Sequence, residues 1–402
     1  MVLSEWQVDN KIVACVTDNA ANMVKAVQLA KWWHVPCFAH SLNLIVQSSL
    51  IEITDTLSKV KSIVEFFKRS TSAMEKLQNV QQRMGASVLK LKQDCPTRWN
   101  STSDMLRRFS KNKESLQSTL GILNNPTLPV LSPEDWYIIE TCSDILIIFE
   151  EITVEISAEK NVSLSKIAIL SKNLISYCSR LKSETFENGF VINMVNKLYD
   201  EVGKRFKWKY RNITIIWEAT FLDPRFKQHG FHEDDIFKQT KENVIKKCMQ
   251  IREREKDKLQ KNTTDESRTI STPTLSTSSK KSSRFGDIWT EFDSTVGTMI
   301  EKTDNSMAAA IIEVDKYLQM PLISRKADPL LWWKENKNLF PSLSDLMKRR
   351  LCIPATSVPC ERIFSKSGQI ITERRNRLSA EKSSKIIFLN SYFNSFIMNS
   401  EK

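Results

Sequence analysis

The sequence is poor in the two residue types that turn a chain sharply. Only 8 of its 402 residues are glycine and 12 are proline. An all-β architecture with many tight turns uses both residues freely, so this composition argues against one. Long stretches rich in Leu, Ile, Lys and Glu instead predict a mainly helical protein.

Long apolar runs and paired cysteines are also missing. No apolar run reaches the roughly 18 residues of a membrane-spanning helix, and no secretory signal opens the chain. We therefore expect no membrane partner. The eight cysteines are scattered without close C-x-x-C pairs, which favours reduced thiols in a cytosolic or nuclear protein.

Positive charge is in excess. The chain has 59 Lys and Arg against 47 Asp and Glu, a formal net charge of +12. A basic surface attracts polyanions. DNA or RNA is therefore the first class of partner to consider, ahead of membrane surfaces, and we expect no small-molecule substrate.

Two short strands are predicted near the N-terminus. The run KIVACVT at 11–17 is continuously apolar in its centre, as in a strand buried on both faces, and a second strand is predicted at 35–38. Helical stretches at 20–33 and 40–49 follow them. This β-α-β-α order predicts parallel strands joined by a right-handed crossover.

The rest of the sequence divides into three parts, which gives four predicted domains in all. Residues 1–50 hold the strands, and 51–250 carry helical patterns. Residues 251–284 begin with charged residues and become rich in Ser, Thr and Lys, so they predict a disordered linker. Residues 285–402 regain apolar periodicity and form the last unit.

Two carboxylates are candidates for chemistry. Asp18 follows the first predicted strand, and ligands bind at the carboxyl ends of strands in open α/β sheets. A carboxylate at this position could hold a divalent metal, but it could also cap the next helix. Glu361 falls in the first turn of a helix that Ser357 and Pro359 would begin.

Cysteine, histidine, tryptophan and arginine supply further candidates. Cys37 and His40 have the spacing of zinc ligands, with His34 nearby, but a structural zinc site needs four donors, which favours packing or substrate contact. Trp99 could stack on an unpaired base while Arg98 holds a phosphate. The alternative is a buried tryptophan at a helix start.

A cluster of arginines lies near the C-terminus. Its members, Arg374, Arg375 and Arg377, are suited to phosphate contact. The alternative is a basic turn that only faces solvent.

Six segments carry a resemblance to a known family. In chain order they read VTDNAANM at 16–23, CFAH at 37–40, TRWNST at 97–102, ATFLDPRFK at 219–227, the stretch 329–393 that begins PLLWWK, and within it IPATSVPCERIFS at 353–365. Together they resemble the hAT superfamily of transposases, in particular its animal branch with BED-type zinc fingers. Each motif is weak alone, but six in the family's order are specific.

The resemblance implies a fold and a chemistry. The family has an RNase H-like core interrupted by a large all-helical insertion, with three carboxylates that hold magnesium. By motif, Asp18 is the second carboxylate and Glu361 the third. Trp99, with Arg98 beside it, would hold an unpaired base, with Cys37 and His40 near the same site.

Two parts of the family pattern have no counterpart in the sequence. Asp9 is the only Asp before Asp18 and stands too close to be the first carboxylate, and no Cys/His cluster precedes residue 15 to form a BED finger. We therefore expect a mainly α protein with a small parallel β remnant, a truncated RNase H-like core. Asp18 and Glu361 would be vestigial catalytic residues with weak magnesium affinity. We expect no enzyme activity, no cofactor and one bare sheet edge.

The resemblance also implies dimerisation through the C-terminal region. Apolar residues there suit either an obligate interface, which is large and apolar, or helices that cover the core. The interface candidates are Leu331, Trp332, Trp333, Phe340, Leu343, Leu346 and Phe388.

Three functions follow from the sequence. The first is a non-catalytic, transposase-derived protein in the nucleus that self-associates and binds DNA. The second is a subunit of an active transposase whose other part lies outside this chain. The third is a helical interaction scaffold without DNA binding, which would lack the salt-sensitive affinity that the first predicts.

Overall fold

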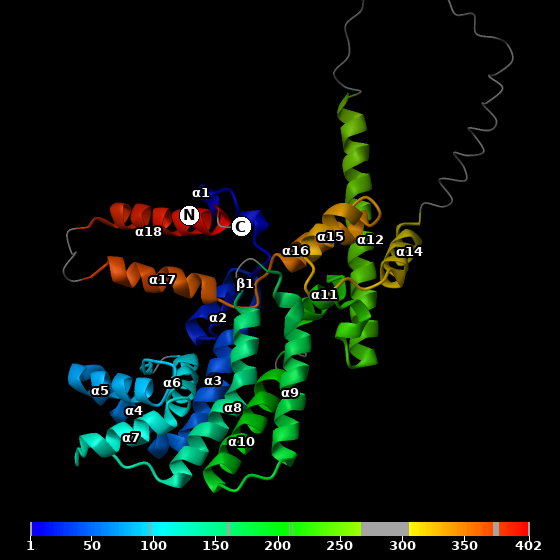
Figure 1. Cartoon of the computed structure of the whole chain (residues 1–402). Coiled ribbons are helices and arrows are strands. Elements are labelled where there is room, and N and C mark those ends of the chain that lie inside the picture. The colour runs from blue at the N-terminus through cyan, green and yellow to red at the C-terminus, as the bar shows by residue number, and fades with distance from the viewer. Residues whose placement is uncertain are drawn as a thin grey trace, which may run out of the picture. The chain divides into compact units, whose positions relative to one another are not determined.

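A computed structural model describes residues 2–95, 98–158, 161–208, 210, 212–266, 305–372 and 378–400. The described chain is mainly helical with one small parallel sheet, as the sequence predicts (Figure 1). It packs as two compact units, Met1–Ile213 with Ile353–Lys402, and Thr214–Cys352. None of the helices described is both long and apolar enough to cross a bilayer.

The sheet consists of two parallel strands within the described residues. Strand β1, Ala14–Thr17, pairs with β2, Trp33–Pro36. Helix α2, Ala21–Leu29, connects the strands and contacts both, which confirms the predicted β-α-β order. The second strand lies two residues earlier than predicted, because the next helix already begins at Phe38. A two-stranded sheet is marginal alone and depends on the packing of helices around it.

The first unit contains most of the helices. Along the chain they are α1 Val2–Glu5, η1 Asp9–Lys11, α3 Phe38–Leu50, η2 Ile51–Ile53, α4 Thr54–Arg69, α5 Thr71–Arg83, α6 Trp99–Ser110, α7 Lys113–Leu123, α8 Pro133–Ile156, η3 Leu164–Lys166, α9 Ile167–Ser183, α10 Gly189–Val202, the π-helical η4 Gly203–Trp208, α17 Val358–Ile370 and α18 Ala380–Ser400.

Helix α8 shows how local sequence fixes an element of this unit. Ser132 and Asp135 form a reciprocal capping box, with proline at the first helical position. The apolar residues that recur at helical spacing between Ile138 and Phe149 are buried. Asp135 is itself buried and accepts hydrogen bonds from Thr56 and Lys59 of α4. The carboxylate that starts α8 therefore also ties it to α4.

The second unit contains α11 Thr214–Leu222, η5 Lys227–Gly230, α12 Asp234–Glu266, α14 Ser306–Gln319, α15 Pro329–Asn336 and α16 Pro341–Leu351. Every residue of α11 from Ile215 onward is buried, so this helix is the centre of the unit. Its one charged residue, Glu218, pairs with Arg350 at 2.6 Å and with Lys247. A buried carboxylate needs such partners, because an unpaired charge in the interior is strongly destabilising.

The compact units do not follow the four predicted domains. Residues 214–250, assigned to the helical insertion from the sequence, pack here with α14 and α16. The linker was also predicted to start too early, since α12 continues as helix through 251–266. Its charged residues alternate in sign along the helix, which a solvated helix tolerates well. The rest of the predicted linker lies outside the described residues.

A candidate site where four chain segments meet

The carboxyl end of the sheet joins the first two segments. Cys37, directly after β2, donates its backbone N–H to the Thr17 carbonyl at 2.7 Å and so prolongs the pairing of the strands. His34 adds a side-chain hydrogen bond of 2.8 Å between its Nε2 and the Thr17 hydroxyl. Asp18 follows at once; it is exposed, and its Oδ1 accepts a hydrogen bond from the Ala20 N–H at 3.1 Å.

The thiol of Cys37 brings in the third segment. Cys37 is buried and is the N-cap of α3, where its sulfur accepts the His40 backbone N–H at 3.4 Å. The same sulfur accepts the Ser357 N–H at 3.3 Å. Beside it, Phe38 donates its N–H to the Ala355 carbonyl at 3.0 Å. The three-residue spacing of Cys37 and His40 is therefore the spacing of a helix cap and the N–H it satisfies.

Glu361 belongs to this third segment. It lies in the first turn of α17 and is exposed, and its Oε1 accepts the Ser357 hydroxyl at 2.8 Å. Ser357 thus contacts Cys37 through its backbone and Glu361 through its side chain. The structure therefore attaches the segments of both predicted carboxylates, Asp18 and Glu361, to one end of the sheet.

The fourth segment is the π-helical turn η4 and the residues after it. Phe206 and Tyr210 are buried against Phe38, with ring centroids 4.6 and 5.9 Å away. The Tyr210 hydroxyl donates to the Pro36 carbonyl at 3.3 Å and lies 3.3 Å from the Ser41 hydroxyl. Burial raises the pKa of Tyr210 well above its usual value, so this phenol stays a donor.

The sequence analysis missed this fourth segment, although a signal was present. Residues 204–211 read KRFKWKYR, in which five basic residues alternate with three aromatic ones. That composition is typical of surfaces that contact nucleic acid.

Asp18 and Glu361 are the two predicted magnesium ligands at this end of the sheet. One oxygen of Asp18 is engaged by the Ala20 N–H and one of Glu361 by the Ser357 hydroxyl. Magnesium needs near-ideal octahedral geometry and several hard oxygen ligands. In the part of the chain that the structure describes, no three His, Cys, Asp or Glu side chains are grouped so that they could hold a metal.

Two of the predicted DNA contacts have other roles in the structure. Trp99 is only 2% exposed and packs edge-on against Phe149, so its ring has no free face on which a base could stack. Its backbone N–H at the start of α6 donates to the Asn43 side chain. Cys37 is likewise buried, with its sulfur engaged twice. For both Trp99 and Cys37, the structure therefore favours the alternative interpretation, in which the side chain packs inside the protein.

The other predicted contacts divide into two groups. Arg98 is exposed and His40 is half-buried, so both could reach a ligand. The three arginines of the C-terminal cluster, Arg374, Arg375 and Arg377, lie outside the described residues.

The predicted dimer residues separate into core and surface. Trp333, Phe340, Leu343 and Leu346 are buried in the second unit, so of the two alternatives for these four residues the structure favours core. Trp332 is half-buried and stacks on Phe340 with centroids 6.1 Å apart. The apolar stretch of α15 and α16 is thus core, because it covers α11 and α14.

The remaining two candidates, Leu331 and Phe388, are 54% and 65% exposed. Phe388 belongs to a larger uncovered surface on α17 and α18, which contact each other and lie side by side (Figure 1). Helix α17 buries none of its residues. We call this surface the α17–α18 face; its exposed apolar residues are Ile363, Phe364, Ile371, Ile386, Phe388, Leu389, Tyr392 and Phe393.

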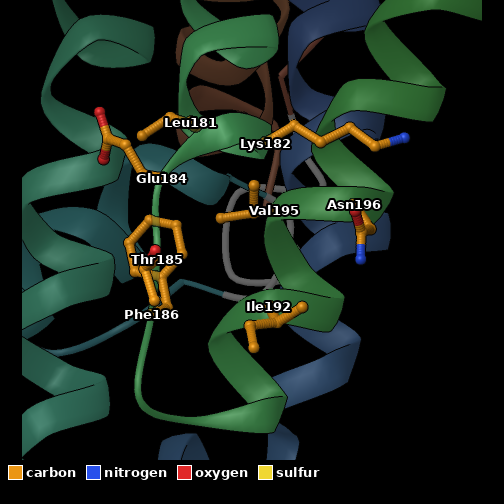
Figure 2. A pocket seen from close by; sticks show the side chains of 8 residues that line it. All are labelled: Leu181, Lys182, Glu184, Thr185, Phe186, Ile192, Val195 and Asn196. Atoms are coloured by element: carbon orange, nitrogen blue, oxygen red, sulfur yellow. The ribbon is translucent and has the colours of Figure 1, made fainter.

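A small cavity lies elsewhere in the first unit, between the end of α9 and the start of α10 (Figure 2). Its volume is about 230 Å³. None of the predicted site residues lines it. The eight lining residues are Leu181, Lys182, Glu184, Thr185, Phe186, Ile192, Val195 and Asn196.

Comparison with known proteins finds two matching family regions within the chain. Residues 313–393 match the hAT family C-terminal dimerisation region, and residues 35–145 match the ZBED1 RNase-like helical domain. These matches confirm the family resemblance and the helical, RNase-like character of the fold.

Relatives matched over almost the whole chain agree with this class. Human zinc finger BED domain-containing protein 4 is 26% identical over 93% of this chain and 30% of its own length. The putative AC transposase of Zea mays is 26% identical over 94% of this chain and 48% of its own. Mouse zinc finger BED domain-containing protein 6 is 25% identical over 93% of this chain and 39% of its own length. The chain is thus related to both hAT transposases and BED proteins, and it spans a third to a half of their length.

Proposed function

We propose that this chain is a transposase-derived protein that self-associates through its hAT C-terminal region and binds DNA in the nucleus, without breaking or joining DNA strands. The observation that supports self-association best is the uncovered α17–α18 face, which lies within the matched dimerisation region, residues 313–393.

The α17–α18 face has the character of a protein interface. Phe364 on α17 is 72% exposed, and Phe388, Tyr392 and Phe393 on α18 are each more than half exposed. Burial of exposed apolar side chains is favourable by roughly 25 cal/mol per Å² of apolar surface, so two neighbouring helices that expose this many favour association. A second copy of the chain is the partner we propose, because the matched family region is described as a dimerisation region.

Sedimentation equilibrium between about 1 and 50 μM tests this proposal. We expect wild type to be a dimer or larger, and the double variant Phe364→Glu/Phe388→Glu to be monomeric. The matched control, Ile122→Glu/Val154→Glu, changes two exposed apolar residues of α7 and α8 and should leave the assembly intact. A wild-type chain that is monomeric throughout this concentration range would contradict the proposed self-association. A dimer that survives the first double variant would place the interface elsewhere.

Absence of catalysis is proposed from the two carboxylates. Both Asp18 and Glu361 are exposed, and each is engaged by a local hydrogen bond. Two such groups are too few for the metal-dependent phosphoryl chemistry of three-carboxylate sites. A plasmid-nicking assay with 5–10 mM magnesium should show no turnover; nicking that Glu361→Gln abolishes would contradict the proposal.

A second candidate function is a subunit of an active transposase. The attachment of the Asp18 and Glu361 segments to one end of the sheet favours it, and so does the greater length of the relatives. In that case a segment outside this chain supplies the first carboxylate. Nicking should then appear only when that segment is added, and Asp18→Asn should abolish it.

A further inference from the structure

The residues around the end of α6 carry far more positive than negative charge. Residues 81–115 include eight Lys or Arg and three Asp or Glu, a net charge of +5 against +12 for the whole chain. They join α5, α6 and α7, which lie together in the first unit (Figure 1). Positive surfaces attract polyanions, so this stretch is a candidate for such a contact.

Most of the negative charge in this stretch is already neutralised. Asp94 and Asp104 form ion pairs of 2.8 Å with Lys61 and Lys92. Of the three acids, only Glu114 on α7 forms no ion pair within the described residues. Little negative charge therefore remains to compensate the other cations.

Three cations at the end of α6 are uncompensated. Lys90 and Lys111 are exposed and Arg108 is half-buried, and none of the three forms an ion pair in the part of the chain that the structure describes. Arg108 donates a guanidinium N–H to the Lys90 carbonyl at 3.2 Å, so these two residues are neighbours. Lys111 is the C-cap of α6, three positions after Arg108. We call Lys90, Arg108 and Lys111 the α6-end cluster.

The backbone that carries the α6-end cluster is fixed by buried polar contacts. The buried side-chain amide of Gln81 donates to the Leu89 carbonyl at 3.1 Å and to the Asn112 side chain. Asn112 in turn donates to the Arg108 carbonyl at 2.6 Å. Leu91, next to Lys90, is buried as well. The three cations therefore stand on an ordered surface, and binding costs little additional ordering of the loop.

We propose that the α6-end cluster binds the sugar-phosphate backbone of duplex DNA. The inference rests on the DNA-binding part of the proposed function and adds where the contact is made. Arg108 gives one N–H to a neutral carbonyl, which leaves its charge and its other donors for a phosphate. Residues three positions apart on a helix are neighbours, so Lys111 can contact an adjacent phosphate. Such contacts release counterions and do not read the bases.

The test measures affinity for a fluorescent 20-base-pair DNA duplex by anisotropy, from about 50 to 300 mM salt. The variant Lys90→Gln/Lys111→Gln removes two charges but keeps the hydrogen bond of Arg108, which goes to the Lys90 backbone. We expect an affinity loss of about tenfold at low salt, and a slope of log Kd against log salt that is smaller by about 2.

The matched control is Lys172→Gln/Lys197→Gln. It removes two lysines of α9 and α10 that likewise form no ion pair among the described residues. Because these lysines lie outside the α6-end cluster, the control should change affinity less than about twofold. The variant Lys90→Arg/Lys111→Arg keeps both charges and should keep the affinity. Circular dichroism and melting temperature should match wild type in every variant.

A competitor tests whether an acidic protein surface is the true partner. Polyglutamate presents carboxylates in place of phosphates, and it should displace the duplex only at a charge concentration at least about tenfold above that of unlabelled DNA. Displacement by polyglutamate at equal charge concentration would overturn DNA as the partner of the α6-end cluster.

The other possible failures are distinguishable. A wild-type chain without affinity for the duplex at about 50 mM salt would contradict DNA binding in the proposed function itself. If wild type binds, but Lys90→Gln/Lys111→Gln weakens binding no more than its control, the inference about the α6-end cluster is wrong while the proposed function stands.

Discussion

Ser357 donates its backbone N–H to the thiol sulfur of Cys37 at 3.3 Å, although 320 positions separate the two residues. The same sulfur caps α3 through the His40 N–H. Cys37 thus joins the start of α3 to the segment that leads into α17. Loss of its side chain leaves two backbone donors without this acceptor, and one of them, the Ser357 N–H, attaches the segment of Glu361.

The first prediction concerns this sulfur. Cys37→Ala should lower the free energy of unfolding by about 1–2 kcal/mol, because two N–H groups lose their acceptor. Cys37→Ser should lower the free energy of unfolding less, since its hydroxyl oxygen accepts the same hydrogen bonds and serine is a preferred N-cap residue. Urea denaturation of both variants measures the difference. Equal losses for the two variants, or none for Cys37→Ala, would show that the sulfur serves only to fill space.

Local signals in the sequence predicted much of the fold. The start of α8 is an example, since Pro133 and the acids Glu134 and Asp135 are typical of a first helical turn and the helix begins at Pro133. Likewise, the apolar run that ends at Thr17 predicts β1, and the structure has the strand there. Its predicted burial on both faces is wrong, because only Thr17 of β1 is fully buried and Ala14–Val16 are half-buried. These signals work because each depends on neighbours in the chain.

Contacts between residues that are distant in the chain could not be predicted from such local signals. The sequence marks Trp99 and Trp333 as large apolar side chains, but whether such a side chain meets its own chain or a partner depends on tertiary packing. The structure buries both rings. The role of Cys37 was likewise hidden, since one of the two hydrogen bonds that its sulfur accepts comes from the distant Ser357. The basic segment around Phe206 could have been found from composition alone.

The second prediction concerns pH. Burial raises the pKa of the Cys142 and Cys178 thiols from 9.0 to about 12. In the unfolded chain the same thiols ionise near pH 9, so the unfolded state binds fewer protons above that pH. The stability they contribute is therefore complete below pH 9 and is lost as pH rises toward 12.

Comparison of wild type with Cys142→Ala isolates this effect, because other titrating groups contribute equally to both proteins. The wild type should be more stable at pH 7.5, and its advantage should shrink by about 2 kcal/mol between pH 9 and 10.5. Cys178→Ala should behave in the same way. Urea denaturation at each pH measures the advantage, and a constant difference across the range would contradict the assigned thiol.

The third prediction concerns a buried lysine of the second unit. Lys227 is fully buried, and its ammonium donates to the carbonyls of Tyr317 and Met320 at 2.6 and 2.7 Å. It also lies 4.5 Å from the centre of the Tyr317 ring. These carbonyls end α14, where helices leave acceptors unpaired and favour cations.

Lys227→Met keeps most of the side-chain volume but removes both hydrogen bonds. We expect the free energy of unfolding to fall by about 2–3 kcal/mol, because two buried carbonyls lose their donor. The matched control, Lys334→Met, changes an exposed lysine of α15 and should change stability by less than about 0.5 kcal/mol. Equal effects of the two substitutions would mean that the Lys227 contacts add nothing to stability.

The fourth prediction follows from the way in which the second unit is assembled. Its parts before Glu266 and after Asn305 meet between α12 and α14, between α11 and α16, and through the motif at 219–227. The Tyr317 hydroxyl donates to the Phe221 carbonyl at 3.1 Å and the Trp333 indole N–H to the Leu222 carbonyl at 2.9 Å. Both aromatic side chains are buried, so apolar burial adds to these bonds.

A protease site introduced between Glu266 and Asn305 should therefore leave the two fragments associated after cleavage. Tagged N-terminal fragment should retain the C-terminal fragment through gel filtration at about 1 μM. Trp333→Ala should lower the fraction that is retained, since the substitution removes one hydrogen bond and about 3–5 kcal/mol of packing. The control Leu331→Ala, an exposed neighbour on the same helix, should not. Separation of the wild-type fragments on cleavage would show that the contacts of the 219–227 motif are too weak to hold the second unit together.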